Sequence, residues 1–535
     1  MKRLVVSAAL CVAAVLPAQQ PGLDVEHYDV HLVLPRQGKR ISADVRVRIG
    51  AFPPGVPVRL DLHRAMIVSS VRVGCGEARE TGDYTHEGDV LAVRLTESSG
   101  PACIDVRYSG APADGLIIGT DSAGRWIGFG DNFPNRARYW LPTNDHPSDK
   151  ATVTWEVTVP SGRSVVANGE RTHDDAAGPG ERMITFTESR AIPTYAMVIA
   201  AGPLVMHDLG PTACGFAEGG GCVPQMIWTA PEQAKFLPGN FARAGEIVGF
   251  FARTFGAFPY EKLAHLQTTT RYGGMENSSA IFYADAMFRR PGGVSEGIIA
   301  HETAHQWFGD AVTEREWAHA WLSEGFATFL AALWTQDAHG DSAYHADLAR
   351  MRREVLGARV TGERAVIDSV EADPNRLLNE NTYQKGGFVL QMLRTQLGDR
   401  AFFAGLRSYF ADHKNGNAMT QDLRRALEQS SQSDLGWFFD QWLRRPGWAQ
   451  LRTAWHWDAD TRRVTLEVEQ SRRFGAYRLP LTIDVMDASG GRRRVTVPLG
   501  AVPSQRVMLP GEFAAAPRAL VFDPDVALLA EITAK

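Results

Sequence analysis

The chain has 535 residues, of which 44% are apolar and 22% are charged, and its formal net charge is −5. This composition is typical of a soluble globular protein of several domains, and it excludes a disordered tail, a collagen-like fibre and a polytopic membrane protein. A mildly acidic chain has no electrostatic footprint for nucleic acid or for an anionic membrane, so we expect neither as a partner.

The first residues predict that the chain is exported. A basic start at residues 1–3 is followed by an apolar run from Leu4 to Leu16 and by a small residue, Ala18, next to a proline. This is the layout of a secretory signal peptide. The run is too short to span a bilayer, which takes about 20 residues; the alternative is a buried N-terminal strand or helix. We therefore expect a signal peptide over residues 1–18, a periplasmic or extracellular protein, and no membrane span.

Four of the five cysteines lie beyond this segment, in two pairs that are close in sequence. An even number of cysteines in an exported chain suggests disulfides. We expect Cys75 to pair with Cys103, and Cys214 with Cys222. The alternative is four free, partly buried thiols. No cysteine spacing resembles a zinc knuckle, so sulfur is not expected to bind a metal.

The spacing of apolar residues changes twice along the chain. Over residues 19–205 apolar and polar residues alternate, as they do at 153–159, which predicts an antiparallel β domain. Over residues 206–445 long segments such as 295–308 have apolar residues at helical spacing, which predicts a mainly helical domain. Alternation returns over residues 446–535 and predicts a small β domain. The expected fold class is multidomain α+β.

The strongest local signal is the sequence His-Glu-Thr-Ala-His at 301–305. On a helix, His301 and His305 lie on one face within reach of one ion, and neutral imidazole nitrogen suits Zn²⁺. Glu302 lies about 100° round the helix from His301, so it can lie beside a metal without binding it. The alternative is a pair of core histidines.

Two histidines make an incomplete metal site, so a third ligand is expected downstream. Glu324, in Trp-Leu-Ser-Glu-Gly-Phe, follows His305 after eighteen intervening residues, which is enough for a loop and the start of a returning helix. Two histidines and a glutamate leave a fourth position for water, which is a catalytic arrangement and not a closed structural one. The alternative is a glutamate on an ordinary helix face.

Two further segments are weak signals when they are taken alone. Residues 272–277, Tyr-Gly-Gly-Met-Glu-Asn, would let a backbone approach a bound peptide, or they form a turn before an exposed glutamate. Tyr383, in Asn-Thr-Tyr-Gln-Lys-Gly-Gly, is by default a core tyrosine.

In this order, however, Gly-Gly-Met-Glu-Asn, His-Glu-x-x-His, the downstream glutamate and Tyr-x-Lys-Gly resemble the gluzincin aminopeptidase family, which includes aminopeptidase N and the leukotriene-epoxide hydrolase. The likeness covers nearly the whole chain. Residues 136–151 resemble the family's Ala-Arg…Pro-x-x-Asp-x-Pro-x-x-Lys-Ala stretch, and residues 522–525, Phe-Asp-Pro-Asp, resemble the close of its β-sandwich domain.

The resemblance implies a thermolysin-like catalytic domain at 206–445 and a β-sandwich at 446–535. Many relatives carry a large C-terminal helical domain that roofs the active site. This chain resembles a short form without it, so we expect a more open cleft or one closed by a partner subunit.

The resemblance also implies roles for the residues that match its motifs. One zinc ion per chain would be bound by His301, His305 and Glu324. Glu302 would be the general base, and Tyr383 would donate a hydrogen bond to the oxyanion.

Within residues 272–277, Glu276 would bind the free α-ammonium of the substrate. Gly273 and Gly274 would offer backbone hydrogen bonds to the peptide. Met275 would line the pocket for the first side chain, and Asn277 completes this substrate-binding motif.

The sequence departs from the family pattern at several positions. Asp131 stands where many members have the Gln of a Gln-x-Glu motif, and Phe133 replaces its Glu. Asp131 is still a candidate for binding the substrate amine; the alternative is a turn residue. Asp310 stands where Asn is common, and we expect it to hydrogen-bond a zinc-binding histidine. His319 lacks ligand spacing and is expected to be a packing residue.

The function expected from these residues is that of an exported zinc aminopeptidase, which hydrolyses the N-terminal residue from peptides with a free N-terminus through a metal-activated water. Two alternatives remain open: a zinc endopeptidase that shares only the metal motif, and a non-catalytic, peptidase-like binding protein. The preferred N-terminal residue and the oligomeric state are also left open.

Overall fold

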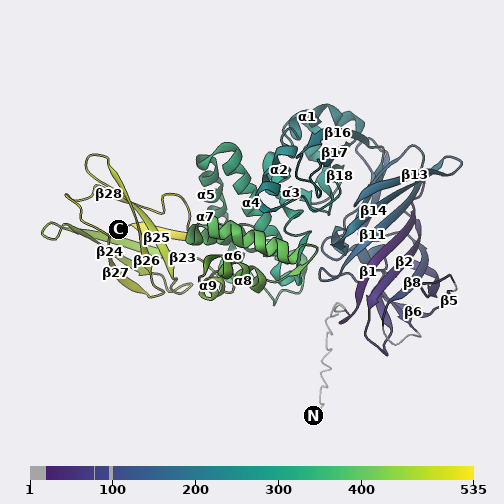
Figure 1. Ribbon diagram of the computed structural model, residues 1–535, viewed down its shortest axis with the longest axis horizontal. Helices are drawn as coiled ribbons and strands as arrows, with labels where there is room; N and C mark the ends of the chain where they lie inside the picture. Colours follow the sequence, from purple (N-terminus) through teal and green to yellow (C-terminus); the bar gives the residue numbers. More distant parts are fainter. Residues whose placement is uncertain (1–19, 78, 96–99, 535) are drawn as a thin grey trace, which may run out of the picture.

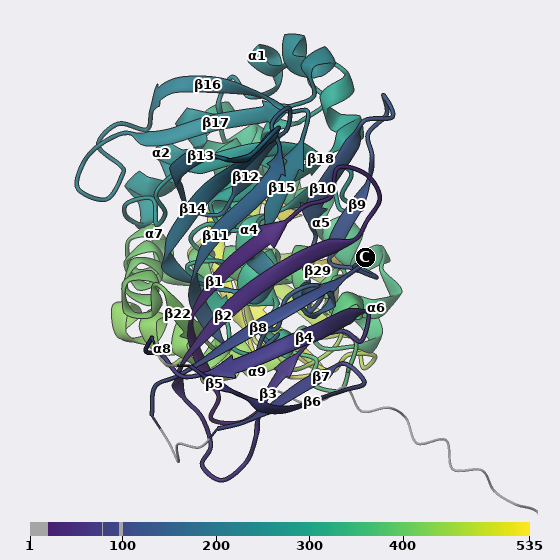
Figure 2. The ribbon, with the colours of Figure 1, turned by 90° about the vertical axis from the view of Figure 1, so that its right-hand side faces the viewer.

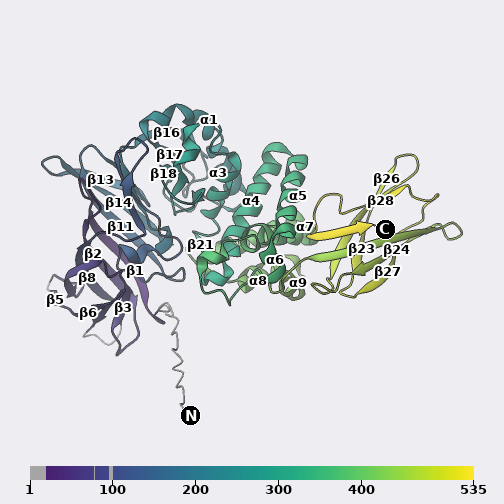
Figure 3. The ribbon, with the colours of Figure 1, turned by 180° about the vertical axis from the view of Figure 1, so that it is seen from behind.

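The computed structural model describes residues 20–77, 79–95 and 100–534, and the predicted signal peptide lies outside these ranges. Three domains lie in a row along the longest axis of the molecule: a β domain, a mainly helical domain and a smaller β domain (Figure 1). This confirms the expected α+β fold class. Figure 3 shows the same row from behind, with the last strand, in yellow, in the third domain. Within the described ranges, no helix is both long enough and apolar enough to cross a membrane.

The N-terminal domain is built on an eight-stranded sheet, which Figure 2 shows face-on. The strand order is β13-β14-β11-β1-β2-β8-β4-β5. Neighbours are antiparallel except β1 and β11, which run parallel. The strands are β1 (Asp24–Val33), β2 (Ile41–Ala51), β4 (Met66–Val73), β5 (Glu80–Thr81), β8 (Ala102–Gly110), β11 (Lys150–Pro160), β13 (Glu170–Gly178) and β14 (Glu181–Pro193).

Two smaller sheets complete this domain, in the orders β12-β15-β10-β9 and β3-β7-β6. Alternation in the sequence explains the packing: in β11, Val153, Trp155, Val157 and Val159 are buried, and the polar residues between them face outward. The strands are β3 (Val58–Asp61), β6 (Asp83–Glu87), β7 (Val90–Arg94), β9 (Leu116–Thr120), β10 (Trp126–Gly130), β12 (Ser164–Ala167) and β15 (Ile199–Gly202).

The solvent face of the eight-stranded sheet carries a polar hollow of about 570 Å³. Its lining residues come from β1, β2, β4, β8 and the position just before β5, and they are mainly arginine and aspartate. Asp29, Asp44 and Asp105 are each paired with an arginine of a neighbouring strand. The hollow is therefore a cross-strand ladder of ion pairs on a solvated face.

The second domain begins with a five-stranded sheet in the order β16-β17-β18-β20-β19. β19 lies at the edge, antiparallel to β20, and it contacts helix α3. The sequence signals for this sheet are weak because β18 is buried along its whole length, which removes the alternation of polar and apolar residues. The strands are β16 (Val205–Thr212), β17 (Val223–Thr229), β18 (Leu263–Thr268), β19 (Gly274–Met275) and β20 (Ala280–Ala284).

Helices make up most of the second domain: α1 and α2 come between β17 and β18 in the chain, and the others follow the sheet. A short parallel pair, β21 (Val312–Glu314) and β22 (Gly416–Ala418), lies among them. One turn of π-helix, Asn381–Lys385, leads into α7, which is kinked at Gly398. The helices are α1 (Leu237–Asn240), α2 (Ala244–Phe255), α3 (Glu296–His305), α4 (Trp321–His339), α5 (Asp341–Gly357), α6 (Arg359–Glu363), α7 (Gly386–His413), α8 (Thr420–Ser431) and α9 (Gly436–Leu443).

The C-terminal domain consists of two sheets, with the strand orders β27-β24-β23-β29 and β26-β25-β28. Leu466 and Val468 of one sheet and Leu481 and Ile483 of the other are buried in one core, as a β-sandwich requires. The strands are β23 (Ala449–Asp458), β24 (Arg463–Gln470), β25 (Leu479–Met486), β26 (Arg492–Leu499), β27 (Ser504–Met508), β28 (Ala519–Phe522) and β29 (Ala530–Ala534).

Both expected disulfides are present. Cys75–Cys103 ties the segment after β4 to β8, and Cys214–Cys222 closes the glycine-rich loop between β16 and β17.

The first two domains are joined by direct contacts close to the His-Glu-x-x-His helix. The ammonium group of Lys150, at the start of β11, donates to the carbonyl oxygens of Asp310, Ala311 and Gly416 over 2.8–3.2 Å. A β-domain side chain therefore holds the loop that follows α3.

Candidate active site

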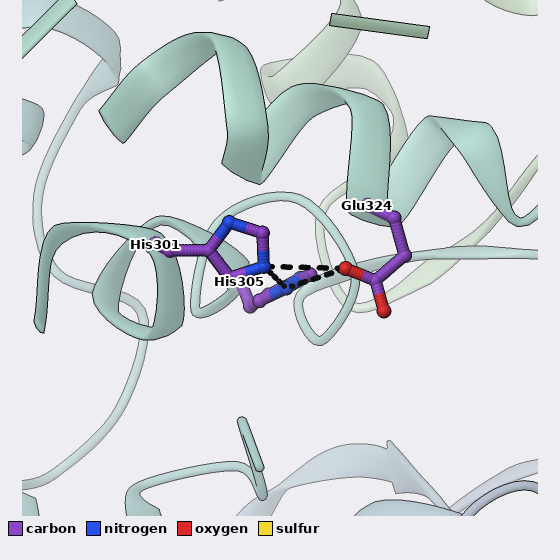
Figure 4. Close-up of side chains that lie close together, drawn as sticks. All are labelled: His301, His305 and Glu324. Atoms are coloured by element: carbon purple, nitrogen blue, oxygen red, sulfur yellow. Dashed lines mark hydrogen bonds and ion pairs between the residues drawn. The ribbon is translucent and has the colours of Figure 1, made fainter. Parts of the chain in front are cut away.

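The three expected metal ligands converge on one point between two helices (Figure 4). His301 and His305 project from α3, and Glu324 projects from the first turn of α4. The two imidazole Nε2 atoms are 3.2 Å apart, and each lies 3.3 Å from Oε2 of Glu324. Ser295 caps the start of α3, and its hydroxyl accepts a hydrogen bond from the backbone N–H of Ile298.

This triangle of donor atoms fits a zinc ion. Four ligands at ~2.05 Å in a tetrahedron are separated from one another by ~3.3 Å, and the separations here are 3.2–3.3 Å. The charges fit as well. Glu276, Glu302 and Glu324 share one buried space with the two imidazoles, so the site has a surplus of negative charge that a divalent cation would offset.

Two groups orient the ring of His305 through its Nδ1 atom. Its Nδ1 lies 3.3 Å from the carbonyl oxygen of Phe308 and 3.0 Å from the hydroxyl of Ser323, which leaves Nε2 to face the other ligands. A Cβ on Gly309 would lie 2.5 Å from that hydroxyl and 2.9 Å from Nδ1, so this turn requires a glycine.

The expected contact between Asp310 and a histidine is wrong. The Asp310 carboxylate accepts a hydrogen bond of 2.8 Å from Nε2 of Gln306. The reason is the turn that follows α3: it places Gln306 beside the carboxylate, so the glutamine and not a histidine binds Asp310.

Burial and neighbouring charge shift the ionisation of these groups. Burial alone would raise the pKa of Glu324, but hydrogen bonds with His301 and His305 hold that pKa well below its usual value. Burial alone would lower the pKa of His305, but the carboxylates of Glu276 and Glu324 raise it to about 10. Burial raises the pKa of Glu302 well above its usual value and that of Glu276 to about 7. These opposite shifts indicate a site in which the carboxylates need positive charge.

Glu302 lies against the edge strand β19. Its side chain is 5% exposed, and an ideal Cβ on Gly274 would lie only 2.0 Å from its Oε1. The backbone of Gly274 thus passes directly beside the carboxylate, and only a glycine allows this approach.

The structure brings the glycine motif to the metal ligands. The carboxylate of Glu276 lies within 4.8 Å of ligand atoms of Glu302 and His305. Gly273 accepts a backbone hydrogen bond of 3.1 Å from the N–H of Ala284, next to β19. The outer edge of β19 has no further strand among the described residues, as an incoming extended peptide would require.

The neighbours of Glu276 are buried as well. The side chain of Met275 is 3% exposed and belongs to an apolar cluster that also contains Phe133 and Tyr195. Asn277 is fully buried. Neither side chain is open to solvent, although both belong to the expected substrate-binding motif.

Tyr383 lies beside the ligands. Its hydroxyl donates a hydrogen bond of 2.6 Å to Oε1 of Glu324, the carboxylate oxygen that faces away from the histidines, and its ring stacks on that of His301. Burial and the nearby carboxylates raise the pKa of this hydroxyl well above its usual value, so it keeps its proton as a donor.

Asp131 does not offer a free carboxylate. Its Oδ1 pairs with Arg136 at 2.7 Å, and Arg136 also pairs with Asp114 at 2.7 Å. Phe133 packs edge-on against the rings of Tyr195, Tyr272 and Trp317.

His319 packs as expected, with its Nδ1 2.7 Å from the hydroxyl of Thr420. Two residues that contact the site were not predicted from the sequence: Ser323, which hydrogen-bonds Nδ1 of His305, and Gln306, which hydrogen-bonds the carbonyl oxygen of Glu276. Both are direct neighbours of ligands in the sequence, and this adjacency is the only signal that could have found them.

Residues 241–442 match the sequence model described as "Peptidase family M1 domain", and residues 24–196 match "Peptidase M1 N-terminal domain". The chain is 29% identical to aminopeptidase N of Streptomyces lividans over 61% of its length and 38% of that protein. It is 26% identical to aminopeptidase B of Mus musculus over 73% of its length and 63% of that protein. The chain thus spans less than two thirds of the length of these curated relatives.

Among solved structures, an M1 zinc metallopeptidase from Deinococcus radiodurans superposes with a TM-score of 0.69 and 27% identity, covering 80% of this chain and 95% of that one.

Proposed function

Because the chain belongs to peptidase family M1, we propose that it is a zinc aminopeptidase that removes the N-terminal residue from peptides. The observation that carries this proposal is the position of Glu276, whose carboxylate lies within 4.8 Å of Glu302 and His305. In an N-terminal residue, the amine nitrogen and the carbonyl carbon are only ~2.5 Å apart. A carboxylate that binds the amine must therefore lie this close to the groups that act on the carbonyl.

His301, His305 and Glu324 would hold the zinc ion. When bound there, Zn²⁺ lowers the pKa of a water from 15.7 to about 7 and polarises the scissile carbonyl.

The residues around the ligands would then carry out the proton transfers. Glu302 would take a proton from the attacking water and later pass it to the leaving amine. Burial alone disfavours its carboxylate form, and positive charge at the three ligands restores it. Tyr383 keeps its proton and would donate it in a hydrogen bond to the developing oxyanion.

Specificity for chain ends would follow from Glu276. A free α-ammonium pairs with this carboxylate. An N-acetylated or internal peptide would leave a buried anion without a partner, which is costly. This argues against the endopeptidase alternative, because an endopeptidase has no use for a carboxylate at this position.

We also propose that the protein is exported. Two disulfides within one chain support an oxidising compartment outside the cytosol.

The test is a panel of aminoacyl-arylamides, incubated with the purified protein before and after removal of metal by a chelator. We expect hydrolysis to stop with the chelator and to return with about one equivalent of zinc, and Glu302→Gln to remain inactive with zinc bound. Full activity of the metal-free protein would contradict the proposal.

A further inference from the structure

The residue after the second histidine, Gln306, ties the metal-bearing helix to the segment that contains Glu276. Gln306 is fully buried. Its Oε1 accepts a hydrogen bond of 2.8 Å from the backbone N–H of Ser279, and its Nε2 donates over 2.8 Å to the carbonyl oxygen of Glu276. The same amide nitrogen donates to the carboxylate of Asp310 over 2.8 Å. One side chain of the helix thus binds both ends of the segment 276–279.

Other residues also form hydrogen bonds with the segment 276–279. Asn168 donates its amide to the carbonyl oxygen of Ser278 over 2.6 Å, and the backbone N–H of Gly169 donates to the hydroxyl of Ser279 over 2.8 Å. The ammonium of Lys262 donates to the carbonyl oxygen of Ser279 over 2.9 Å.

Ser279 itself has φ = 60°, a left-handed conformation that is uncommon for a residue with a side chain. Such a conformation persists only where surrounding contacts impose it. Surrounding contacts therefore fix the backbone conformation of the segment after Glu276. Gln306 links this segment to α3, the helix that carries His301 and His305.

We propose that Gln306 is a positioning residue, which fixes the carboxylate of Glu276 at the distance from the metal ligands that the amine of an N-terminal amino acid requires. This inference rests on the proposed function. The hydrogen bond of Gln306 to Glu276 goes to the carbonyl oxygen of that residue and not to its carboxylate. Gln306 thus binds the main chain of Glu276, and it directly follows His305 as the C-cap residue of α3.

The chemistry of the three bonds explains why the residue is a glutamine. The site presents one N–H, one carbonyl oxygen and one carboxylate to a single side chain, and a primary amide supplies the one acceptor and the two N–H donors that these bonds need. An apolar side chain of similar length would leave the N–H of Ser279 and the carbonyl of Glu276 buried without partners. Asparagine is one methylene shorter and cannot reach both groups.

Loss of the hydrogen bonds of Gln306 is expected to weaken binding of the substrate amine. The amine is bound in the ground state and in the transition state alike, so a displaced Glu276 raises KM more than it lowers kcat. A ligand without a free ammonium makes no pair with Glu276, and its affinity stays unchanged.

The chain offers a closely matched control. Gln470, in the C-terminal β domain, is a buried glutamine that also makes three hydrogen bonds. Its Nε2 donates to the carbonyl oxygens of Tyr477 and Gly500 over 2.9 Å, and its Oε1 accepts from the N–H of Tyr477 over 2.9 Å. Replacing it by methionine removes the same number of bonds outside the active site.

The experiment compares zinc-loaded wild type, Gln306→Met and Gln470→Met. Calorimetry measures the Kd of L-phenylalaninol, which has a free amine and no amide bond to cleave, and of its N-acetyl derivative, and KM, kcat, zinc content and the unfolding midpoint are measured beside it. For Gln306→Met we expect the Kd of the free amine to rise by a factor on the order of 10 or more, as when a charge-assisted contact is lost. KM should rise by a similar factor, whereas the Kd of the N-acetyl probe and the zinc content stay unchanged. Gln470→Met should lower only the unfolding midpoint.

The proposal is overturned if Gln306→Met loses stability as Gln470→Met does and still prefers the free amine as strongly as wild type. If wild type itself does not prefer the free amine, the proposed function has failed, and that result is distinct from a failure confined to Gln306. If Gln306→Met does not fold, Gln306→Asn is tested in its place. The quantity compared is again the ratio of the Kd of the N-acetyl probe to the Kd of the free amine. If neither variant folds while Gln470→Met does, the glutamine serves the fold as a whole and a role specific to Glu276 is excluded.

Discussion

A methyl group added at Gly274 would collide with the proposed general base. An ideal Cβ at this position lies 2.0 Å from Oε1 of Glu302 and 2.2 Å from its Cδ. Since contacts of a Cβ with other heavy atoms below 3.0 Å are essentially never found, one of the two groups must move by more than about 1 Å. Displacements of this size at a catalytic group cost a factor on the order of 10² in rate.

The same change should leave the fold intact. Gly274 does not have a left-handed φ, so alanine is compatible with its backbone. We therefore expect Gly274→Ala to bind one zinc ion, to unfold within a few degrees of wild type, and to hydrolyse an aminoacyl-arylamide about 10²-fold more slowly in kcat.

Gly297→Ala is the matched control. Gly297 lies in the first turn of α3, the helix that carries Glu302, and a Cβ there meets nothing within 4 Å. Alanine also has the higher helix propensity, by up to ~1 kcal/mol. We expect this variant to match the activity of wild type and to be as stable or more so. If Gly274→Ala stays within a few-fold of the control in kcat, the position assigned to Glu302 is refuted.

Three further changes test other parts of the structure. Tyr383→Phe should lower kcat by ~10²–10³ with zinc still bound, because an oxyanion donor is lost; steady-state kinetics with elemental analysis checks this, and an unchanged kcat would remove Tyr383 from the mechanism. Burial raises the pKa of Asp149 to about 7, so the folded state binds more protons than the unfolded state between pH 4 and 7, and this carboxyl makes the protein less stable as pH rises through that window. In urea unfolding, the difference in unfolding free energy between wild type and Asp149→Asn should change by up to ~1.4 kcal/mol per pH unit in this window. Parallel pH profiles of the two proteins would rule out a buried acid at this position. Serine at both Cys75 and Cys103, which are separated by 28 positions, should cost ~3.5 kcal/mol of unfolding free energy; a loss below about 1 kcal/mol would show that this link does not constrain the unfolded chain.

How much of the site could be predicted depended on where its contacts lie in the sequence. His301 and His305 are four residues apart on one helix, so helical geometry alone predicts that they meet. Gln306 is different: its partner Glu276 is thirty residues away, just after the edge strand β19, and no periodicity connects the two. The ion pair of Asp131 with Arg136 also depends on a turn that the sequence does not specify.

The fold shows a similar division. Alternation in β11 predicts a half-buried strand, and the structure has one. In the second domain, β18 is buried at every position and carries His265 and Gln267 among its apolar residues. Such a strand has no polar face, so its pattern resembles neither a surface strand nor an amphipathic helix.

The central claim is that a metal centre acts beside a carboxylate that binds the free amine of a peptide. The most direct measurement is hydrolysis of one tripeptide with a free N-terminus and of its N-acetylated form by the zinc-loaded protein, with products identified by mass spectrometry. The structure predicts release of the first amino acid from the free peptide and no cleavage of the acetylated one. Equal cleavage of both peptides, or cleavage at an internal bond, would contradict the role of Glu276.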